Sequence, residues 1–474
     1  MNVLFLQSLT YPFIGIMSLS AVLRRSGHQT RLLFVNFSHP DSGDFHRIRD
    51  FAPGLIAIPV YTGWQSSILN FCRQLKEQVD IPIIVGGPHP TQAPGILHDP
   101  CLDFLCLGEG EISFLELVNR LAQKRPTDNI PGIWCKHHGA VIDNGPSPLP
   151  HLPDLPAMDI DLYCQASQAI RLQHNREFSL NRGCPFHCTY CNAPLLRALY
   201  GGEAVRSKTV DQAMEEIHDV YDRYPFKSAY FTSDNLFLDK DFAHRFLPRF
   251  KKEIGVPFSC QMRVELIDAE VASLLRASGC HMVGVGIESG SPRVRREILG
   301  RPMSNRALVR GCRHLQAQGI KINAYNMLGI PGETFAEALE TLALNIEIKP
   351  TTSWISFFQP YPGTKLTRTL LDQGAITPEV FDYIPSSYFE KSVLLNKNGW
   401  QWTNLQRLFP LLVLFPHLAP LAEKLCRIHI PRIYDLVFIT LFYRYVRLAY
   451  NKGPLETLDK VLRNAWEAAR AASH

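Results

Sequence analysis

Two series of short apolar runs, each alternating with amphipathic stretches, constrain the fold of this chain more than any other feature. The first series occupies residues 1 to about 122. Its apolar runs predict buried strands at Val3–Leu6, Gln29–Val35, Leu55–Pro59, Ile81–Val85 and Phe104–Leu107. Amphipathic stretches such as Ser66–Val79 predict helices between them. Alternating strands and helices form a doubly wound parallel sheet, which binds ligands beyond the carboxyl ends of its strands.

The second series occupies residues 176–374 and predicts six more strand–helix units. The expected strands are Phe178–Leu180, Ser228–Thr232, Phe258–Met262, Met282–Ile287, Lys321–Met327 and Trp354–Gln359. A helix is expected at 210–224, where the apolar residues form one stripe: Val210, Ala213, Met214, Ile217, Val220, Tyr221 and Tyr224. Six such units resemble three-quarters of a TIM-type barrel, a partial (β/α)6 barrel with its chemistry on the loops after the strands.

The two remaining segments have a different composition. Residues 123–175 predict a short hairpin around His137-His138-Gly139, followed by a proline-rich linker. We expect the paired histidines to lie in a solvated turn rather than to bind a metal. Residues 375–474 predict a mainly helical C-terminal region.

Composition excludes several classes of protein. Hydrophobic residues make up 46% of the chain and charged residues 20%, which allows a large core. The net charge of +5 is too small over 474 residues to indicate nucleic-acid binding. We find neither a secretory signal nor an apolar run of the roughly 18 residues needed for a membrane span. Twelve cysteines without such a signal predict reduced thiols and a cytoplasmic protein.

Three of these cysteines, Cys184, Cys188 and Cys191, lie within eight residues of one another. Thiolates are soft ligands that suit iron–sulfur clusters or zinc. Three thiols can hold three irons of a 4Fe–4S cluster and leave the fourth iron open for a substrate. A structural zinc site would need a fourth ligand. His187 could supply one, but its place inside the loop, beside Cys188, makes convergence on the same ion awkward.

The Cys-x3-Cys-x2-Cys loop, with Tyr190 before its last cysteine, resembles the signature of the radical S-adenosylmethionine (SAM) superfamily. Membership would make Cys184, Cys188 and Cys191 the metal-binding and catalytic residues. It implies that the open iron binds SAM, and that an electron from a donor such as flavodoxin or ferredoxin cleaves SAM to methionine and a deoxyadenosyl radical. That radical then abstracts hydrogen from a substrate carbon.

The resemblance extends to the loops that follow the later strands of the second series. These loops contain Thr232-Ser233-Asp234-Asn235, Arg263, Gly286-Ile287-Glu288-Ser289-Gly290-Ser291, Gly329-Ile330-Pro331-Gly332-Glu333 and Pro360-Tyr361-Pro362-Gly363-Thr364. The SAM-binding residues that it implies are Tyr190, Asp234, Arg263, Glu288, Gly329, Gly332 and Glu333. From the residues alone, Asp234 could instead cap a helix, Arg263 could form a surface salt bridge, and Glu333 could begin a helix.

The first series resembles the Rossmann-like cobalamin-binding domain that one large subclass of radical SAM enzymes carries. The resemblance rests on Gly86-Gly87-Pro88-His89, on Gly108-Glu109-Gly110-Glu111, and on residues 15–28. It implies cobalamin contacts from Tyr61, Thr62, Gly86, Gly87, Pro88, His89, Gly108, Glu109 and Gly110. The alternative is a flavodoxin-like domain without a ligand. The loop after the first strand, Ser8–Gly15, contains neither Asp nor His, so we expect no histidine ligand to cobalt from it.

These features favour a cobalamin-dependent radical SAM methyltransferase that methylates an unactivated carbon of a small-molecule or lipid-like intermediate. One alternative uses both cofactors for cyclisation, rearrangement or oxidation. A more distant one is a non-catalytic metal-binding scaffold. The aromatic residues of the C-terminal region leave open a substrate channel or a peripheral contact with a membrane, although ordinary helix packing explains them more simply. These aromatic residues are Trp402, Phe409, Phe415, Tyr434, Phe438, Phe442 and Tyr445.

Overall fold

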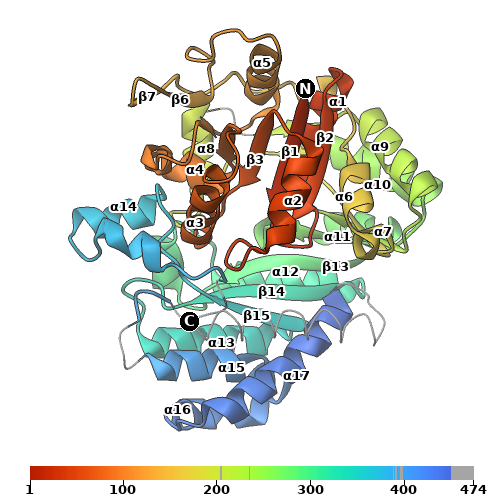
Figure 1. Cartoon of the computed structure of the whole chain (residues 1–474). Helices are drawn as coiled ribbons and strands as arrows, with labels where there is room; N and C mark the ends of the chain where they lie inside the picture. Colours follow the sequence, from red (N-terminus) through yellow and green to blue (C-terminus); the bar gives the residue numbers. More distant parts are fainter. Residues whose placement is uncertain (203–204, 234, 388, 390–391, 396–398, 450–474) are drawn as a thin grey trace. The chain divides into compact units, whose positions relative to one another are not determined.

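The computed structural model describes residues 1–202, 205–233, 235–387, 389, 392–395 and 399–449, and it divides into two compact units (Figure 1). The first unit contains residues 1–173, 179–225 and 360–386. The second contains residues 174–178, 226–359 and the chain from 387 onward. Each unit is built around its own sheet.

The sheet of the first unit has seven strands in the order β2-β1-β3-β4-β5-β6-β7. Strands β1 to β5 are parallel, and the hairpin of β6 and β7 extends the sheet in antiparallel fashion. Their bounds are β1 Asn2–Gln7, β2 Gln29–Phe34, β3 Leu55–Pro59, β4 Ile83–Gly86, β5 Phe104–Cys106, β6 Ile133–His137 and β7 Ala140–Ile142. The order reverses between β1 and β3, and the loops after these two strands form the usual ligand-binding edge of a doubly wound sheet.

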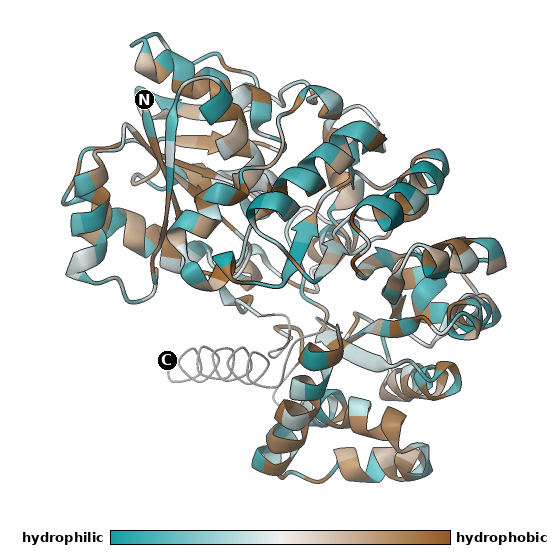
Figure 2. Ribbon diagram, turned by 90° about the vertical axis from the view of Figure 1, so that its right-hand side faces the viewer, coloured by the Kyte–Doolittle hydropathy of each residue, from teal (hydrophilic) through white to brown (hydrophobic). Residues whose placement is uncertain are grey.

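Helices cover this sheet because their apolar residues recur at helical spacing. The helices are α1 Ile14–Arg25, α2 Ser42–Phe51, α3 Gln65–Lys76, α4 Pro88–Gln92 and α5 Glu111–Ala122. Phe45 of α2 and Phe71 of α3 stack with ring centroids 5.7 Å apart, in a core shared with β1, β3, β4 and β5. Helices α1 and α5 contact each other. Figure 2 shows helices that carry both hydrophilic and hydrophobic residues, as expected of helices with one buried face.

Residues 152–223 contribute further helices and a short ribbon to the first unit. They include α6 Ile160–Ala166, α7 Gln168–Arg171, α8 Ala193–Leu199, α9 Val210–Arg223 and a short antiparallel ribbon of β9 Asn181–Arg182 and β10 Arg206–Ser207. Four of the seven apolar residues expected in the stripe of α9 are buried, while the other three are half-buried. Glu216 of α9 is also buried, which the apolar pattern did not predict.

Residues 360–386 return to the first unit after the second sheet is complete. Helix α14 (Lys365–Asp372) begins there, and Leu366 N donates to Thr189 O over 2.8 Å. Gly63 lies so close to this segment that an added Cβ would be 2.4 Å from Pro385 O. A glycine is therefore required at position 63, where φ is also +95°.

The sheet of the second unit has six parallel strands in the order β15-β14-β13-β12-β11-β8. Their bounds are β8 Asn175–Phe178, β11 Ser228–Phe231, β12 Phe258–Met262, β13 Cys280–Glu288, β14 Lys321–Leu328 and β15 Thr352–Phe357. The sheet is open, with β8 and β15 at its edges, and the expected fold class with a partial barrel is confirmed. The intervening helices are α10 Lys240–Glu253, α11 Ala269–Ala277, α12 Asn305–Ala317 and α13 Phe335–Ile348.

Strand β8 begins three residues earlier than expected. Its residues Asn175 to Phe178 pair one-to-one with β11, whereas Leu180 O accepts a hydrogen bond from Lys208 N instead. The prediction missed the start of this strand because it relied on apolar runs. An edge strand needs no such run, and this one begins with three polar residues, Asn175, Arg176 and Glu177.

A phenylalanine cluster fixes α10 on the second sheet. Phe242, Phe246 and Phe250 recur every four residues and so lie on one face of the helix. The rings of Phe246 and Phe250 lie 5.3 and 5.2 Å from that of Phe231 on β11, and Phe258 on β12 lies 5.0 Å from it. Each such aromatic pair adds about 1 kcal/mol beyond burial.

The C-terminal region is helical, with α15 Trp400–Leu414, α16 Ala422–Cys426 and α17 Pro431–Ala449. Helix α15 contacts β15, α13, α16 and α17. Trp354 of β15 packs against α17, with its ring 4.5 to 5.8 Å from those of Phe438, Phe442 and Tyr445. Among the described residues, none of the helices has the length and hydropathy of a membrane-spanning segment.

We expect Glu216→Ala to destabilise the protein by about 3 kcal/mol. The Glu216 carboxylate accepts from Lys208 Nζ at 2.6 Å and from Met158 N at 3.2 Å, and its loss leaves both donors without this acceptor. Urea unfolding would measure the change. Glu215→Ala is the matched control, because Glu215 is the exposed neighbour on the same helix, and its effect should stay within about 0.5 kcal/mol. Equal shifts in the two variants would contradict the expectation.

Candidate cofactor sites

The loop with three cysteines leaves β9 at Gly183, whose φ of +93° suits a glycine, and ends where α8 begins. Cys188 is buried, and Cys184 and Cys191 are half-buried. All twelve cysteines lie in the described residues and none forms a disulfide. In the described part of the chain, no group of three or more His, Cys, Asp or Glu side chains is arranged to hold a metal ion. The three thiols therefore fit a cluster by their number, softness and common loop, and not as a preformed cage.

His187 does not join these thiols. Its two ring nitrogens lie 2.7 and 3.0 Å from Arg197 Nη2, and the imidazole is exposed. The Arg197 guanidinium also donates to Pro185 O, so this arginine of α8 contacts two residues of the cysteine loop, Pro185 and His187. The donor set offered to a metal is three thiolates without an imidazole, which matches an open fourth iron better than a closed zinc site. Tyr190 is half-buried between Thr189 and Cys191.

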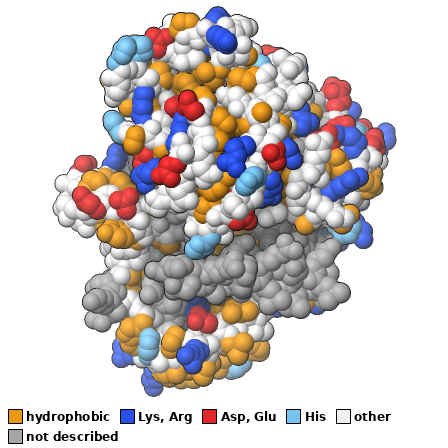
Figure 3. Space-filling view, viewed as in Figure 1, with side chains coloured by type: hydrophobic (Ala, Val, Ile, Leu, Met, Phe, Trp, Pro, Cys, Tyr) orange, Lys and Arg blue, Asp and Glu red, His pale blue; other side chains and the backbone are white. Residues whose placement is uncertain are grey.

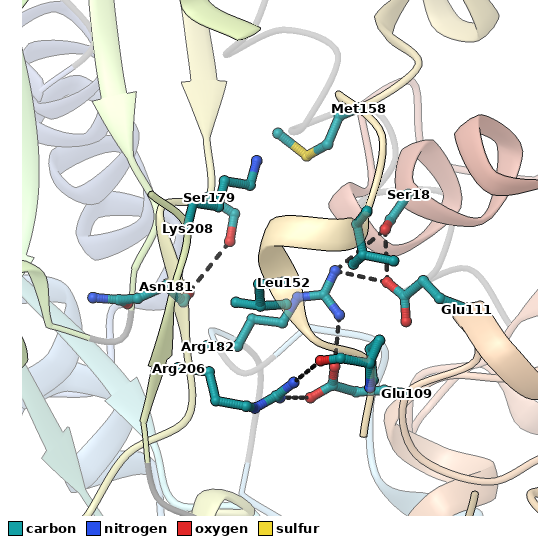
Figure 4. A network of polar contacts seen from close by, with 12 residues as sticks. Ser18, Glu109, Glu111, Leu152, Met158, Ser179, Asn181, Arg182, Arg206 and Lys208 are labelled. Atoms are coloured by element: carbon teal, nitrogen blue, oxygen red, sulfur yellow. Dashed lines mark hydrogen bonds and ion pairs between the residues drawn. The ribbon is translucent and has the colours of Figure 1, made fainter. Parts of the chain in front are cut away.

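The strand that leads into the cysteine loop is held by an ion-pair cluster of Glu109, Glu111, Arg182 and Arg206 (Figure 4). Arg182 Nη1 donates to Glu109 Oε2 and Arg182 Nη2 to Glu111 Oε1, each over 2.7 Å. Arg206 donates to the other oxygen of Glu109. Glu111 begins α5 and Glu109 lies two residues earlier, in the loop after β5, while the two arginines face each other across the β9–β10 ribbon. This ion-pair cluster joins the N-terminal sheet to the cysteine loop within one unit.

Burial and charge oppose each other at Glu111. Burial alone would raise the pKa of its carboxyl, but the Arg182 guanidinium and a 2.6 Å hydrogen bond from Ser18 outweigh it and lower the pKa below its usual value. Glu111 is therefore ionised at neutral pH. A buried carboxylate of this kind stabilises the fold only while its partners remain in place.

Gly108 and Gly110 accommodate side chains of the protein itself. A Cβ on Gly108 would lie 2.0 Å from the Tyr200 hydroxyl oxygen, and one on Gly110 would lie 2.8 Å from Cys106 Sγ. The Tyr200 hydroxyl also accepts from Glu109 N at 2.6 Å. Tyr200 directly follows α8, so the helix after the cysteine loop packs against the loop after β5.

The loops after β3 and β4 meet at the carboxyl edge of the first sheet. His89 N donates to Val60 O over 3.0 Å, and Thr62 Oγ1 lies 3.0 Å from His89 Nδ1. His89 is buried, and burial lowers its pKa to about 4, so the imidazole is neutral at physiological pH. Gly87 has a φ of +97°, which only a glycine adopts readily. A Cβ on Gly86 would lie 3.4 Å from Cys106 Cβ, and one on Gly87 would lie 3.4 Å from Val60 O, so the two glycines let these loops pack closely at the edge.

Aromatic side chains from the loop after β1 lie beside the loop after β3. The rings of Phe13 and Tyr61 are 5.2 Å apart, and Tyr11 and Tyr61 are about 40% exposed. Tyr163 of α6 holds the loop after β1 at both ends. Its hydroxyl donates to Gln7 Oε1 at 2.5 Å and accepts from Phe13 N at 3.0 Å. The two loops at the sheet's switch point therefore present exposed aromatic faces for an apolar ring system.

The other residues expected to bind SAM lie in the second unit. Asp234, which was also expected to bind SAM, falls outside the described residues. Arg263, at the end of β12, is largely buried and donates to Glu265 through Nε at 2.6 Å and through Nη2. Glu288, at the end of β13, has a φ of +66°, a left-handed conformation that costs a non-glycine residue roughly 1–3 kcal/mol. Arg301 Nη1 lies 3.7 Å from Glu288 Oε1, and Arg301 Nη2 donates to Gly286 O over 2.7 Å.

Glu333 is a buried acid in the loop after β14. Its Oε2 accepts from Ile330 N at 3.2 Å, while its buried Oε1 has no hydrogen-bond partner. Burial raises the pKa of Glu333 to about 8. It does not begin the next helix, because Thr334 caps α13. Gly329 and Gly332, in the same loop, both have positive φ. The unpaired carboxyl oxygen of Glu333 could therefore form a hydrogen bond with a polar group of a small ligand.

Sequence reasoning missed several residues that shape these sites. Arg295 is fully buried and donates to Ser289 O, Met303 O and the side chain of Asn305, so it fixes the loop after β13. Burial lowers its pKa to about 10. Arg182 stands two residues before the first cysteine, but its partners Glu109 and Glu111 lie more than 70 residues earlier in the chain, so the sequence did not indicate the ion pairs. Nothing in the sequence indicated Tyr200 or Arg295.

We expect Glu109→Gln to destabilise the protein by about 2 kcal/mol and to lower the iron bound per chain after reconstitution, because Arg182 and Arg206 both lose a charged acceptor. Thermal unfolding and iron analysis would measure the two effects. Glu116→Gln is the control: it also pairs with two arginines of the first unit, but on the surface, so the change should be within about 0.5 kcal/mol. Unchanged stability and iron content in Glu109→Gln would contradict the role of the cluster.

Two family models match the chain and together cover more than half of it. The Radical SAM superfamily model matches residues 178–344, which include the three cysteines and strands β11 to β14 of the second sheet. The B12 binding domain model matches residues 8–118, which include the loops after β1, β3, β4 and β5.

Individual proteins agree with these matches. An uncharacterised methyltransferase of Pyrococcus horikoshii is 27% identical over 75% of this chain and 78% of its own length. The cytidylyl-2-hydroxyethylphosphonate methyltransferase of Streptomyces wedmorensis is 25% identical over 78% and 79%. The fold resembles that of TsrM, a radical S-adenosylmethionine methyltransferase from Kitasatospora setae, with a TM-score of 0.67, 17% identity, and 80% and 76% of the two chains covered. The chain belongs to the radical SAM enzymes that carry a B12-binding domain, and its cofactors are a 4Fe–4S cluster, SAM and cobalamin.

Proposed function

We propose that this enzyme transfers a methyl group from SAM, by way of cobalamin, to an unactivated carbon of a small-molecule or lipid-like biosynthetic intermediate. The observation that carries the proposal is the combination, in one compact unit, of a three-thiol loop and a B12-binding sheet joined by the ion-pair cluster. When bound, the cluster and SAM supply a carbon-centred radical and cobalamin supplies a methyl donor. Two relatives of similar length that bear the name methyltransferase support methyl transfer over cyclisation.

The first unit provides residues for two of the cofactors. We assign the three irons of the cluster to Cys184, Cys188 and Cys191, and the contacts with cobalamin to the edge formed by the loops after β1, β3 and β4. The residues that we assign to cobalamin there come from the end of β4 and the segments that follow β3 and β4: Tyr61, Thr62, Gly86, Gly87, Pro88 and His89. Gly108, Glu109 and Gly110 lie beside it, but their place against Tyr200, Arg182, Arg206 and Cys106 gives them a positioning role.

The second unit provides the contacts that we assign to SAM. The Arg263 guanidinium suits a carboxylate, since two planar donors can pair with two oxygens. Glu288 is held by its left-handed backbone and by Arg301 at the end of β13, as polar groups of an active site often are. Gly329 and Gly332 permit close approach of a flat ring, and a protonated Glu333 would donate a hydrogen bond to a ring nitrogen.

The proposal needs a reductant and reduced thiols. Radical formation consumes an electron, which a small electron-transfer protein such as flavodoxin or ferredoxin would supply. Twelve cysteines without a disulfide suit a cytoplasmic setting, where thiols remain reduced.

Product analysis tests the proposal against its runner-up. A methyltransferase should release S-adenosylhomocysteine and deoxyadenosine in a ratio near one when cobalamin and reductant are present, because each methyl group consumes one SAM as donor and one as radical source. Cys188→Ala should abolish deoxyadenosine formation, whereas the buried Cys312→Ala, outside the loop, should retain it. Deoxyadenosine without S-adenosylhomocysteine would favour cyclisation or rearrangement, and wild-type cleavage by Cys188→Ala would refute the assignment of the cluster.

The raised pKa of Glu333 predicts a pH dependence for SAM binding. Because the folded pKa of about 8 exceeds the ordinary value of 4.5, the protonated form predominates at pH 7. The stability linked to this proton is fully present below pH 4.5 and is lost as the pH rises to about 8. SAM affinity, measured by equilibrium dialysis, should fall severalfold between pH 7 and 9. Glu333→Gln keeps a neutral donor and should bind SAM with little pH dependence. An equally steep fall in this variant would show that Glu333 is not the titrating group.

A further inference from the structure

Exposed apolar side chains are concentrated in the C-terminal helices. Of the thirteen large hydrophobic side chains that are exposed in the described residues, eight lie between Leu414 and Ile439. They are Leu414, Phe415, Leu421, Ile428, Ile430, Ile433, Leu436 and Ile439. At the foot of Figure 3, hydrophobic side chains are exposed among basic ones, with a few acidic and histidine side chains between them. Scattered exposed residues need no explanation, but a concentration of this kind marks a surface that contacts something else.

Helix α17 has two apolar faces, and among the described residues only one of them packs against other elements. Tyr434, Phe438, Phe442 and Tyr445 point inward, and the last three contact Trp354. Ile433, Leu436 and Ile439 are 57%, 65% and 42% exposed, and their spacing places them on the opposite side of the helix. Packing against the second sheet therefore accounts for the inner face and leaves the outer face unexplained.

The charges around this outer face are mainly positive. Residues 421–449 contain five exposed cations: Lys424, Arg427, Arg432, Arg444 and Arg447. Their two acids, Glu423 and Asp435, are already paired with Arg427 and Arg407 at 2.5 and 2.8 Å. Among the residues that the structure describes, Arg432, Arg444 and Arg447 form no ion pair. Their long side chains can extend along the apolar surface and place the guanidinium at its rim.

We propose that the outer face of α17, with the adjoining segment Leu421–Ile430, docks on an anionic lipid surface. A helix with aliphatic residues on one face and arginines beside them lies in the plane of a membrane, its apolar side chains among the acyl chains and its cations at the phosphates. A second copy of this chain would present the same positive face and be repelled. Protein interfaces are rich in aromatic anchors, whereas this face is mostly isoleucine and leucine. The inference does not depend on the proposed methyl transfer.

Vesicle sedimentation of the full-length protein tests the proposal. Vesicles of phosphatidylcholine containing 30% phosphatidylglycerol should bind the protein at least tenfold more tightly than pure phosphatidylcholine, and added salt should weaken the binding. Leu436→Ser should bind the anionic vesicles severalfold more weakly, and Ile433→Ser combined with it at least tenfold more weakly. Leu172→Ser is the matched control, because Leu172 of the first unit is 64% exposed and Leu436 is 65% exposed.

Three results would overturn the proposal. One is equal binding to neutral and anionic vesicles, and another is unchanged binding in the double variant. The third is light scattering that shows a dimer of the wild-type protein at micromolar concentration and a monomer of the double variant, which would assign the face to a second copy. Since both substituted residues are exposed, unfolding temperatures within about 2 °C of wild type should accompany any loss of binding.

Discussion

The Arg182 guanidinium, held between two carboxylates of the Rossmann-like sheet, connects the parts of this enzyme that must cooperate. It lies two residues before the first cysteine of the cluster loop. Its partner Glu109 lies in the loop that follows β5, and its partner Glu111 is the first residue of α5. Arg206, on the paired strand β10, forms an ion pair with the other carboxylate oxygen of Glu109. Breaking one partner of such a pair leaves a buried charge without compensation, so the entrance to the cysteine loop is fixed by the same residues that shape the edge of the B12-binding domain.

Packing around this cluster reinforces the connection. Tyr200, at the end of the helix after the cysteines, occupies the space that the missing side chain of Gly108 leaves open. Arg197 on that helix braces the loop through Pro185 and His187. One helix thus contacts the cysteine loop and the B12-binding domain, and Gly108, one of the glycines that resemble a ligand-binding motif, provides room for the protein's own Tyr200.

Periodicity in the sequence predicted both sheets, because buried parallel strands are nearly continuous apolar runs. Strands β1 to β5 and β11 to β15 lie where those runs occur, within a few residues. Strand β8 was misplaced because it is a polar edge strand. The three cysteines could be found because their chemistry depends on local spacing. Arg295, Tyr200 and the burial of Glu216 could not, since each depends on contacts between residues far apart in the chain. The partners of Glu109 were unforeseeable for the same reason, although its position at the sheet edge was expected.

The discontinuous path of the chain through the first unit has a consequence for synthesis on the ribosome. Residues 1–225 emerge first, yet Thr189 O receives its hydrogen bond from Leu366 and Gly63 meets Pro385 only after about 140 further residues have been made. Domains generally fold as they appear, and contacts between distant segments form late. The nascent cysteine loop therefore spends the translation of the whole second sheet without its final neighbours. The cysteine loop therefore reaches its final surroundings only when residues 360–386 are in place.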